Sequence, residues 1–249
     1  MLRKSFKIYV AGNREKMGKT AAGEVGKKIV KLQRKKDYIS MVFGAAPSQN
    51  EMLKNLLAYP GIEWSRIHAF HMDEYTGLSK GAPESFASYL DQNIFLKVNF
   101  KSINYLNGTA ADLNAECERY SALLRKHPVD IVCLGIGENG HIAFNDPPVA
   151  DFNDPKLVKV VELDHACRQQ QVNDGCFPAF DDVPTHALTL TIPALLSGKS
   201  LFCTVPSVRK AQAVRDTLIG QVTEQCPASI LRLHNSVRLF LDKESASLL

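Results

Sequence analysis

The chain has 249 residues, of which 45% are apolar and 22% charged, a composition typical of soluble globular proteins. The formal net charge of +4 is mild, and basic residues gather only within 27–36, where their spacing fits a solvated helix face. No aromatic platform or known binding module accompanies them, so a nucleic-acid partner is not expected.

A membrane association is not expected either. Residues 1–7 lack the apolar core of a signal peptide, and no apolar segment is long enough to cross a bilayer. The six cysteines include no C-x-x-C pair, which argues against a structural zinc site. We therefore expect a cytoplasmic protein with reduced thiols.

The apolar pattern alternates strand-like and helix-like segments along the chain. In order, it predicts strand 6–10, helix 13–34, strand 38–43, helix 52–57, strand 64–72, helices 84–95 and 111–126, strands 129–134 and 187–192, short helix 193–196, strand 200–205, helix 209–218 and strand 237–241. This alternation predicts an α/β fold with a mostly parallel, doubly wound (Rossmann-like) sheet covered by helices on both faces. No repeat, low-complexity segment or linker interrupts it, so we expect a single domain over 1–249.

One segment is similar in sequence to a nucleotide-binding P-loop. Residues 12–20 read Gly-Asn-Arg-Glu-Lys-Met-Gly-Lys-Thr, with five residues between the glycines where a P-loop has four. That spacing decides where the backbone N–H groups point, and Lys19-Thr20 also fits the helical period. The segment is therefore interpreted as part of a helix.

The glycine-rich segment 131–148 follows a predicted strand and carries polar side chains. Apolar residues 131–134 lead into Gly135, Gly137 and Gly140, then His141 and Asp146. Open α/β sheets place their chemistry at such strand ends. The alternative interpretation is a loop with a surface histidine.

Three other strand ends carry polar groups. The small-residue turn 44–49 feeds a helix N-terminus, which suits a phosphate, and Ser48 adds a hydroxyl; alternatively, Ser48 only caps the helix. Asp73 and Glu74 directly follow an apolar strand, where acids are costly to bury. Asp73 is a candidate general base or, alternatively, a turn cap. Lys210, at a helix start, could complete an anion site.

Together these segments resemble the glucosamine-6-phosphate deaminase/isomerase family over nearly the whole chain. The matching motifs are Met72-Asp-Glu-Tyr75 with Gly77-Leu78, the Gly135 to Pro147 segment, the stretch 185–196 and Lys210-Ala211. The related 6-phosphogluconolactonases share the Gly-His loop, but theirs usually continues Thr-Ala-Ser and they lack Met-Asp-Glu-Tyr.

The resemblance implies an amino sugar 6-phosphate as substrate, with no metal or other cofactor. It implies that His141, supported by Asp146 and Asn139, opens the sugar ring and that Asp73 moves a proton between C2 and C1. Loss of ammonia then leaves a ketose 6-phosphate. The substrate and its phosphate would be held by Ala46, Ser48, Gln49, Glu74, Gly137, Gly140, Arg168 and Lys210. Assembly into a homo-oligomer is left open.

The chain departs from the family pattern at several of these positions. Asn139 stands where the family usually has an aspartate, Asp146 replaces a glutamate, and Ala45-Ala-Pro-Ser-Gln49 replaces Thr-Gly-Gly-Thr-Pro. Arg168 begins a segment that replaces the region of a second phosphate arginine. These changes keep two alternatives open: a lactonase or other sugar-phosphate isomerase, and a catalytically impaired sugar-phosphate-binding regulator.

Overall fold

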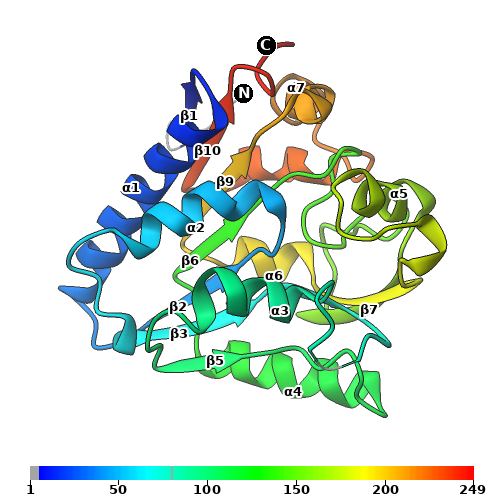
Figure 1. Cartoon of the computed structure of the whole chain (residues 1–249), viewed down its shortest axis with the longest axis horizontal. Coiled ribbons are helices and arrows are strands. Elements are labelled where there is room, and N and C mark those ends of the chain that lie inside the picture. The colour runs from blue at the N-terminus through cyan, green and yellow to red at the C-terminus, as the bar shows by residue number, and fades with distance from the viewer. Residues whose placement is uncertain (1–5, 80) are drawn as a thin grey trace.

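The computed structural model describes residues 6–79 and 81–249, and within them the largest sheet is entirely parallel (Figure 1). Its strand order is β1-β10-β9-β6-β2-β3-β5. The bounds are β1 Phe6–Ala11, β2 Ile39–Phe43, β3 Ile67–His71, β5 Ser102–Asn104, β6 Ile131–Leu134, β9 Ser200–Val205 and β10 Val237–Asp242. Strands alternate in the chain with helices, so the prediction of an α/β fold with a mostly parallel, doubly wound sheet is confirmed.

The central strands are apolar because both faces of the sheet are covered. Every residue of β2, β6 and β9 is buried, as expected for parallel strands between two helical layers. Alternate residues supply two different cores: Val42 and Val132 face one, and Phe43 and Cys133 face the other.

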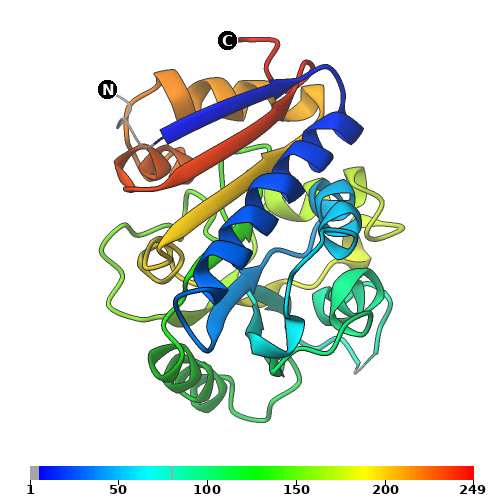
Figure 2. The same ribbon diagram turned by 90° about the vertical axis from the view of Figure 1, so that its left-hand side faces the viewer.

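Helices pack on both faces of this sheet. Core residues of α1 (Arg14–Gln33), α2 (Asn50–Leu57) and α3 (Phe86–Leu90) join the core that contains Phe43. Those of α4 (Leu113–Lys126), α6 (Ile192–Leu196) and α7 (Ala211–Ile219) join the core that contains Val42. Figure 2 shows α1 lying across the strands on the side that faces the viewer. Within the described residues, no helix combines the length and apolarity that crossing a membrane requires.

A second, antiparallel sheet is the main addition to the predicted fold. It consists of β4 (Asp73–Tyr75), β8 (His186–Leu190) and β7 (Val158–Glu162), in the order β4-β8-β7. The predicted strand 187–192 is therefore a strand as far as Leu190, with Ile192 already in α6, and it lies outside the parallel sheet. The chain leaves β3 at His71 and joins this second sheet at Asp73, which pairs with Thr189.

Shorter elements differ from the prediction in detail. The expected strand 64–72 begins with a 3-10 turn, Trp64–Arg66, and the expected helix 84–95 ends in a π-helical turn, Asp91–Phe95. Helix α5 (His165–Asn173) was not predicted. The remaining 3-10 turns are Pro47–Gln49, Phe180–Asp182, Val208–Lys210 and Pro227–Leu233.

Candidate active site

A cavity lies where the loops after β2, β3, β6 and β9 meet. The first two strands belong to one half of the sheet and the last two to the other, so the cavity opens at the switch point between β6 and β2, at the carboxyl ends of the strands. The residues lining it are 44–49, Met72, Asp73, Phe86, 135–137, His141, Ala143, Phe144, Gln170, Gln171, Asp174 and Lys210. The fold thus brings together Ala46, Ser48, Gln49, Asp73, Gly137, His141 and Lys210 from the residues proposed on sequence grounds.

His141 is held by contacts with Asp146 and Asn139. Its Nδ1 lies 2.8 Å from Asp146 Oδ1, and that oxygen also accepts a hydrogen bond of 2.8 Å from Asn139 Nδ2. The Asn139 side-chain oxygen accepts from the backbone N–H of His141 at 3.1 Å. Because Nδ1 is engaged, Nε2 is the ring nitrogen that can exchange a proton with a ligand.

The Asp146 carboxyl is buried, yet its pKa is lowered. Burial by itself would raise this pKa, but the neighbouring His141 and hydrogen bonds from His141, Asn139 and Cys167 together favour the charged form. Asp146 can therefore stay ionised behind the imidazole and stabilise it when it carries a proton.

Two glycines of the loop fit only without a side chain. A Cβ on Gly137 would lie 2.2 to 2.4 Å from atoms of the His141 ring, so the ring rests directly on the backbone. Gly140 has φ +84°, a backbone conformation that favours glycine, and a Cβ there would lie 2.8 Å from Cys226 Sγ. Gly137 lines the cavity, whereas Gly140 shapes the turn that precedes His141.

Asp73 supplies a second carboxyl group to the lining of the cavity. It is the first residue of β4 and is 6% exposed. Burial, and after it the neighbouring Glu74, raise the pKa of Asp73 well above its usual value. Such a carboxyl is a stronger base than an exposed aspartate once it has lost its proton.

The end of the cavity formed by residues 44–49 has the features of an anion site. Lys210 is 7% exposed, and its Nζ has no hydrogen-bond partner among the described residues. Burial lowers the pKa of Lys210, although Asp174 and Glu138 oppose that shift. A buried ammonium without a partner is costly, and an anionic ligand would offset that cost.

Gln49 anchors the turn 44–49, which lines the same cavity as Lys210. Its Nε2 donates to Thr204 Oγ1 at 2.7 Å, to Leu134 O at 3.1 Å and to Ser48 Oγ at 3.1 Å. The side chain therefore ties the turn to β6 and β9. The Ser48 hydroxyl lines the cavity, and the turn leads into the N-terminus of α2, where backbone N–H groups can bind an anion.

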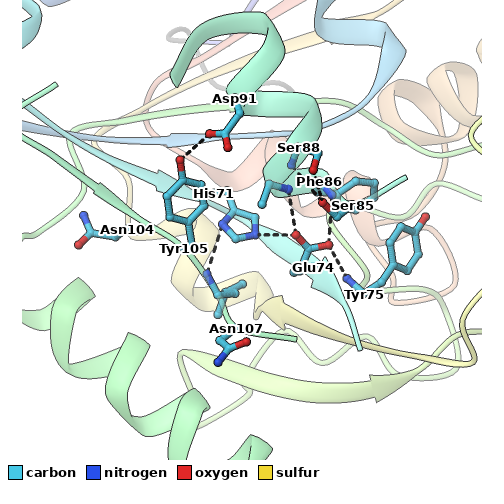
Figure 3. Close-up of polar contacts among 12 residues, drawn as sticks. His71, Glu74, Tyr75, Ser85, Phe86, Ser88, Asp91, Asn104, Tyr105 and Asn107 are labelled. Atoms are coloured by element: carbon cyan, nitrogen blue, oxygen red, sulfur yellow. Dashed lines mark hydrogen bonds and ion pairs between the residues drawn. The ribbon is translucent and has the colours of Figure 1, made fainter. Parts of the chain in front are cut away.

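Besides Gly140, two residues that the sequence predicted to bind substrate, Arg168 and Glu74, are not among the residues that line the cavity. Arg168 donates to Val183 O at 2.8 and 3.2 Å and to Phe180 O at 3.0 Å, and its guanidinium lies 4.1 Å from the Phe180 ring centroid. It holds the 180–183 loop and is not among the lining residues. Glu74 accepts three backbone hydrogen bonds on the far side of β4 (Figure 3).

Helix α5 adds lining residues that the sequence did not indicate. Gln170 and Gln171 are buried in the cavity wall, and Gln170 Oε1 accepts from the backbone N–H of Glu138 at 2.7 Å. The helix is polar and follows no clear apolar period, so neither its presence nor its position was predictable from pattern.

One group of potential metal ligands occurs here among the described residues. The ligand atoms of His141, Asp146 and Cys167 lie within 4.8 Å of one another. Burial, followed by Asp146, raises the pKa of Cys167 well above its usual value, which keeps the thiol protonated. A protonated thiol is a donor to Asp146 rather than a metal ligand, so hydrogen bonding accounts for the proximity of the three residues.

Comparison with known proteins points to one family. A family model described as glucosamine-6-phosphate isomerases/6-phosphogluconolactonase matches residues 12–240. A glucosamine-6-phosphate deaminase of Bacillus cereus strain G9842 is 36% identical over 230 residues, which span 90% of this chain and 84% of the relative. One of Listeria monocytogenes serotype 4a strain HCC23 is 38% identical over 205 residues, which span 82% and 86%.

Solved structures agree with these sequence relatives. A structure described as a monomeric glucosamine-6-phosphate deaminase superposes with a TM-score of 0.88 at 32% identity, covering 98% of this chain and all of the other. The 6-phosphogluconolactonase of Thermotoga maritima gives a TM-score of 0.77 at 20% identity, covering 96% and 100%, which shows a shared fold.

Proposed function

We infer the function from one premise: the chain belongs to the glucosamine-6-phosphate isomerase/6-phosphogluconolactonase family. It is a glucosamine-6-phosphate deaminase, which converts the amino sugar phosphate and water into a ketose 6-phosphate and ammonia. The observation that supports this most directly is that Asp73, His141 and Lys210 line a single cavity although they come from three separate strand ends.

His141 is proposed to open the sugar ring. Its Nε2 takes the proton of the anomeric hydroxyl and delivers it to the ring oxygen, which breaks the C1–O5 bond and leaves an aldehyde at C1. Asp146 stabilises the imidazolium that forms between the two transfers. Asn139 cannot accept a proton, so its role is to hold Asp146 and the His141 backbone in place.

Asp73 is proposed to move the carbon-bound proton. Its carboxylate takes the proton from C2 while the C1 oxygen gains a proton, which gives an enolamine with a C1–C2 double bond. Asp73 then returns the carbon-bound proton to C1, and the amino group releases one proton, which balances the proton gained by the C1 oxygen. The resulting ketimine at C2 adds water and releases ammonia. The raised pKa of Asp73 suits a base that must remove a proton from carbon.

Lys210, Ser48 and the turn at Ala46 are proposed to bind the 6-phosphate. The unpartnered Lys210 Nζ supports this assignment. Phosphate binding is remote from C1 and C2, so its binding energy positions the reacting carbons against Asp73 and His141.

A steady-state assay separates this activity from the alternatives. Ammonia release from glucosamine 6-phosphate supports the deaminase. Hydrolysis of 6-phosphogluconolactone without ammonia release would instead support a lactonase. Tight binding of sugar phosphates without turnover of either compound would support a regulator. A parallel assay with galactosamine 6-phosphate determines the required configuration at C4.

Three further properties are part of the proposal. The chain acts as a single domain over 1–249, an interpretation supported by the two cores that share one sheet. It acts in the cytoplasm, where phosphorylated sugars are retained.

Its oligomeric state is open between a homo-oligomer and a single chain, and a similar solved deaminase is described as monomeric. Light scattering coupled to size-exclusion chromatography measures that state.

A further inference from the structure

Glu74 lies next to the proposed base but points away from the substrate cavity. Its Oε1 accepts hydrogen bonds from the backbone N–H groups of Tyr75 at 2.9 Å and Phe86 at 3.1 Å, and its Oε2 accepts from that of Ala87 at 2.9 Å (Figure 3). The residue is 5% exposed. A carboxylate, which has only acceptors, satisfies all three donors at once.

A buried histidine faces the same carboxylate. His71, the last residue of β3, is fully buried, and its Nδ1 accepts a hydrogen bond from the backbone N–H of Leu106 at 3.3 Å. The proton of the neutral ring must therefore be on Nε2, which lies 3.6 Å from Glu74 Oε2. Figure 3 shows His71 and the start of α3 converging on Glu74 from two sides.

These contacts connect two walls of the cavity. Asp73 directly precedes Glu74 in β4, and Phe86 is the first residue of α3; both line the cavity. The Glu74 carboxylate bonds to the N-terminus of α3 and to the backbone of its own strand. It therefore fixes the distance between the strand that carries the base and the helix that carries Phe86.

We propose that Glu74 is a positioning residue for the deamination reaction, which holds β4 against α3 and acts on Asp73 through its buried negative charge. This inference rests on the proposed function, because it assumes that Asp73 is the base. It replaces the expected role of Glu74 in substrate binding.

The charge of Glu74 has a defined effect on its neighbour. Burial contributes most to the raised pKa of Asp73, and the like charge of Glu74 raises it further. Three other titratable groups interact electrostatically with Asp73: Tyr75 of β4, Tyr120 of α4 and Cys167 of α5. His141, Asp174 and Lys210 line the same cavity, and His71 of β3 lies against Glu74. They are unchanged in a Glu74 variant, so removing the Glu74 charge alone should lower the pKa of Asp73.

The substitution Glu74→Gln tests both parts of the proposal. Gln keeps the size of the side chain but loses the charge and one acceptor oxygen. We expect kcat to fall about 10- to 100-fold, the range found when a supporting hydrogen bond is removed, with little change in KM. We also expect the acid limb of the pH profile to move to lower pH. Substitution of a residue that binds the substrate would raise KM instead.

Ser85→Ala is the matched control. The Ser85 side chain accepts from the backbone N–H of Ser88 and caps the same helix, but it carries no charge. This variant should lose thermal stability while its acid limb stays where it is in the unsubstituted protein. A Glu74→Gln profile identical to that of Ser85→Ala would overturn the proposal.

A second variant and a second readout keep the test decisive. Glu74→Asp keeps the charge on a shorter side chain that cannot reach all three backbone donors. We expect it to keep the acid limb and to lose kcat, and an unchanged kcat would contradict the positioning role. Carbon-13 NMR of labelled aspartate carboxyls, with the Asp73 signal assigned from Asp73→Asn, measures the Asp73 titration without substrate. Its midpoint should move to lower pH in Glu74→Gln and stay fixed in Ser85→Ala.

The two readouts separate the two proposals. An unsubstituted protein that releases no ammonia would refute the deaminase function, whereas the NMR titration would still decide whether Glu74 acts on Asp73. An unchanged Asp73 midpoint in Glu74→Gln would refute the Glu74 proposal while leaving the deaminase function intact.

Discussion

The imidazole Nδ1 of His141 lies 2.8 Å from the carboxylate Oδ1 of Asp146, which is 1% exposed. The shorter aspartate therefore still reaches the imidazole, although the resembled family usually has a glutamate at this position. Asn139 donates to the same oxygen, so the pair is held in one orientation. The contacts around His141 therefore include one buried carboxylate, that of Asp146, whereas the family pattern, with an acid in place of Asn139, would have two.

Asn139→Asp should shift the pH profile of the reaction. The new carboxylate would lie next to Asp146 Oδ1, and a second negative charge favours the protonated imidazole. Because ring opening starts from the neutral imidazole, the pH profile of kcat/KM should change. A pH-rate series measures this shift, and an unchanged profile would contradict a role of the contacts around His141 in the rate.

Asp73→Asn should abolish proton exchange at C2. Removal of a general base typically lowers a rate by about 10²- to 10⁴-fold. Binding of sugar phosphate should persist, because the phosphate contacts proposed for Lys210 and Ser48 are unchanged. Deuterium incorporation from solvent, followed by NMR, is the measurement; exchange at the unsubstituted rate would refute the assignment.

The same substitution should alter the pH dependence of stability. The pKa of Asp73 is raised in the folded state, whereas an unfolded aspartate titrates near about 3.9. At pH values between these two pKa values, Asp73 keeps its proton in the folded state but has lost it in the unfolded chain. The free energy of unfolding therefore decreases as pH rises through this range. Urea unfolding from pH 4 to pH 8 should show a smaller loss of stability for Asp73→Asn than for the unsubstituted protein.

Lys210→Met should weaken binding of the substrate phosphate. Losing a charge-assisted contact costs about 1.5 to 3 kcal/mol, which corresponds to roughly a 10- to 100-fold rise in KM. Arg209→Met is the control, because Arg209 is bound to Asp174 and the carbonyl of Asn173 rather than lining the cavity. Equal effects of the two substitutions on KM would argue against a specific phosphate contact by Lys210.

Gly137→Ala should displace His141. The new methyl group would overlap the imidazole at 2.2 Å, and a shift of about 1 Å in a catalytic group can cost about 10²-fold in rate. Gly23→Ala, in the middle of α1 with nothing within 4 Å of its Cβ, should instead stabilise the fold by about 0.5 to 1 kcal/mol. Unchanged kcat in Gly137→Ala would contradict the described packing.

Arg168→Met should affect stability rather than substrate binding. The guanidinium makes three hydrogen bonds to carbonyls of the 180–183 loop, so its loss should lower the melting temperature. KM should stay close to that of the unsubstituted protein. A tenfold rise in KM would instead support the predicted role of Arg168 in binding the phosphate.

Local sequence determined the parallel sheet and most of its helices. Strands such as 131–134 are buried on both faces and are therefore apolar throughout. Such apolar runs can be recognised as strands from the sequence before it is known which strands they pair with. The glycine-rich loop could also be predicted from the sequence, because tight turns and contact with the His141 ring require residues without side chains.

Only the tertiary structure decided which polar residues share a cavity. Asp73 and Glu74 are adjacent acids with similar chemistry, but successive side chains of a strand point to opposite sides, so one lines the cavity and the other binds the N-terminus of α3. The strand in question, β4, is three residues long and exists because it pairs with β8, more than 100 residues later in the chain. Such pairing depends on long-range contacts, and no local pattern encodes it.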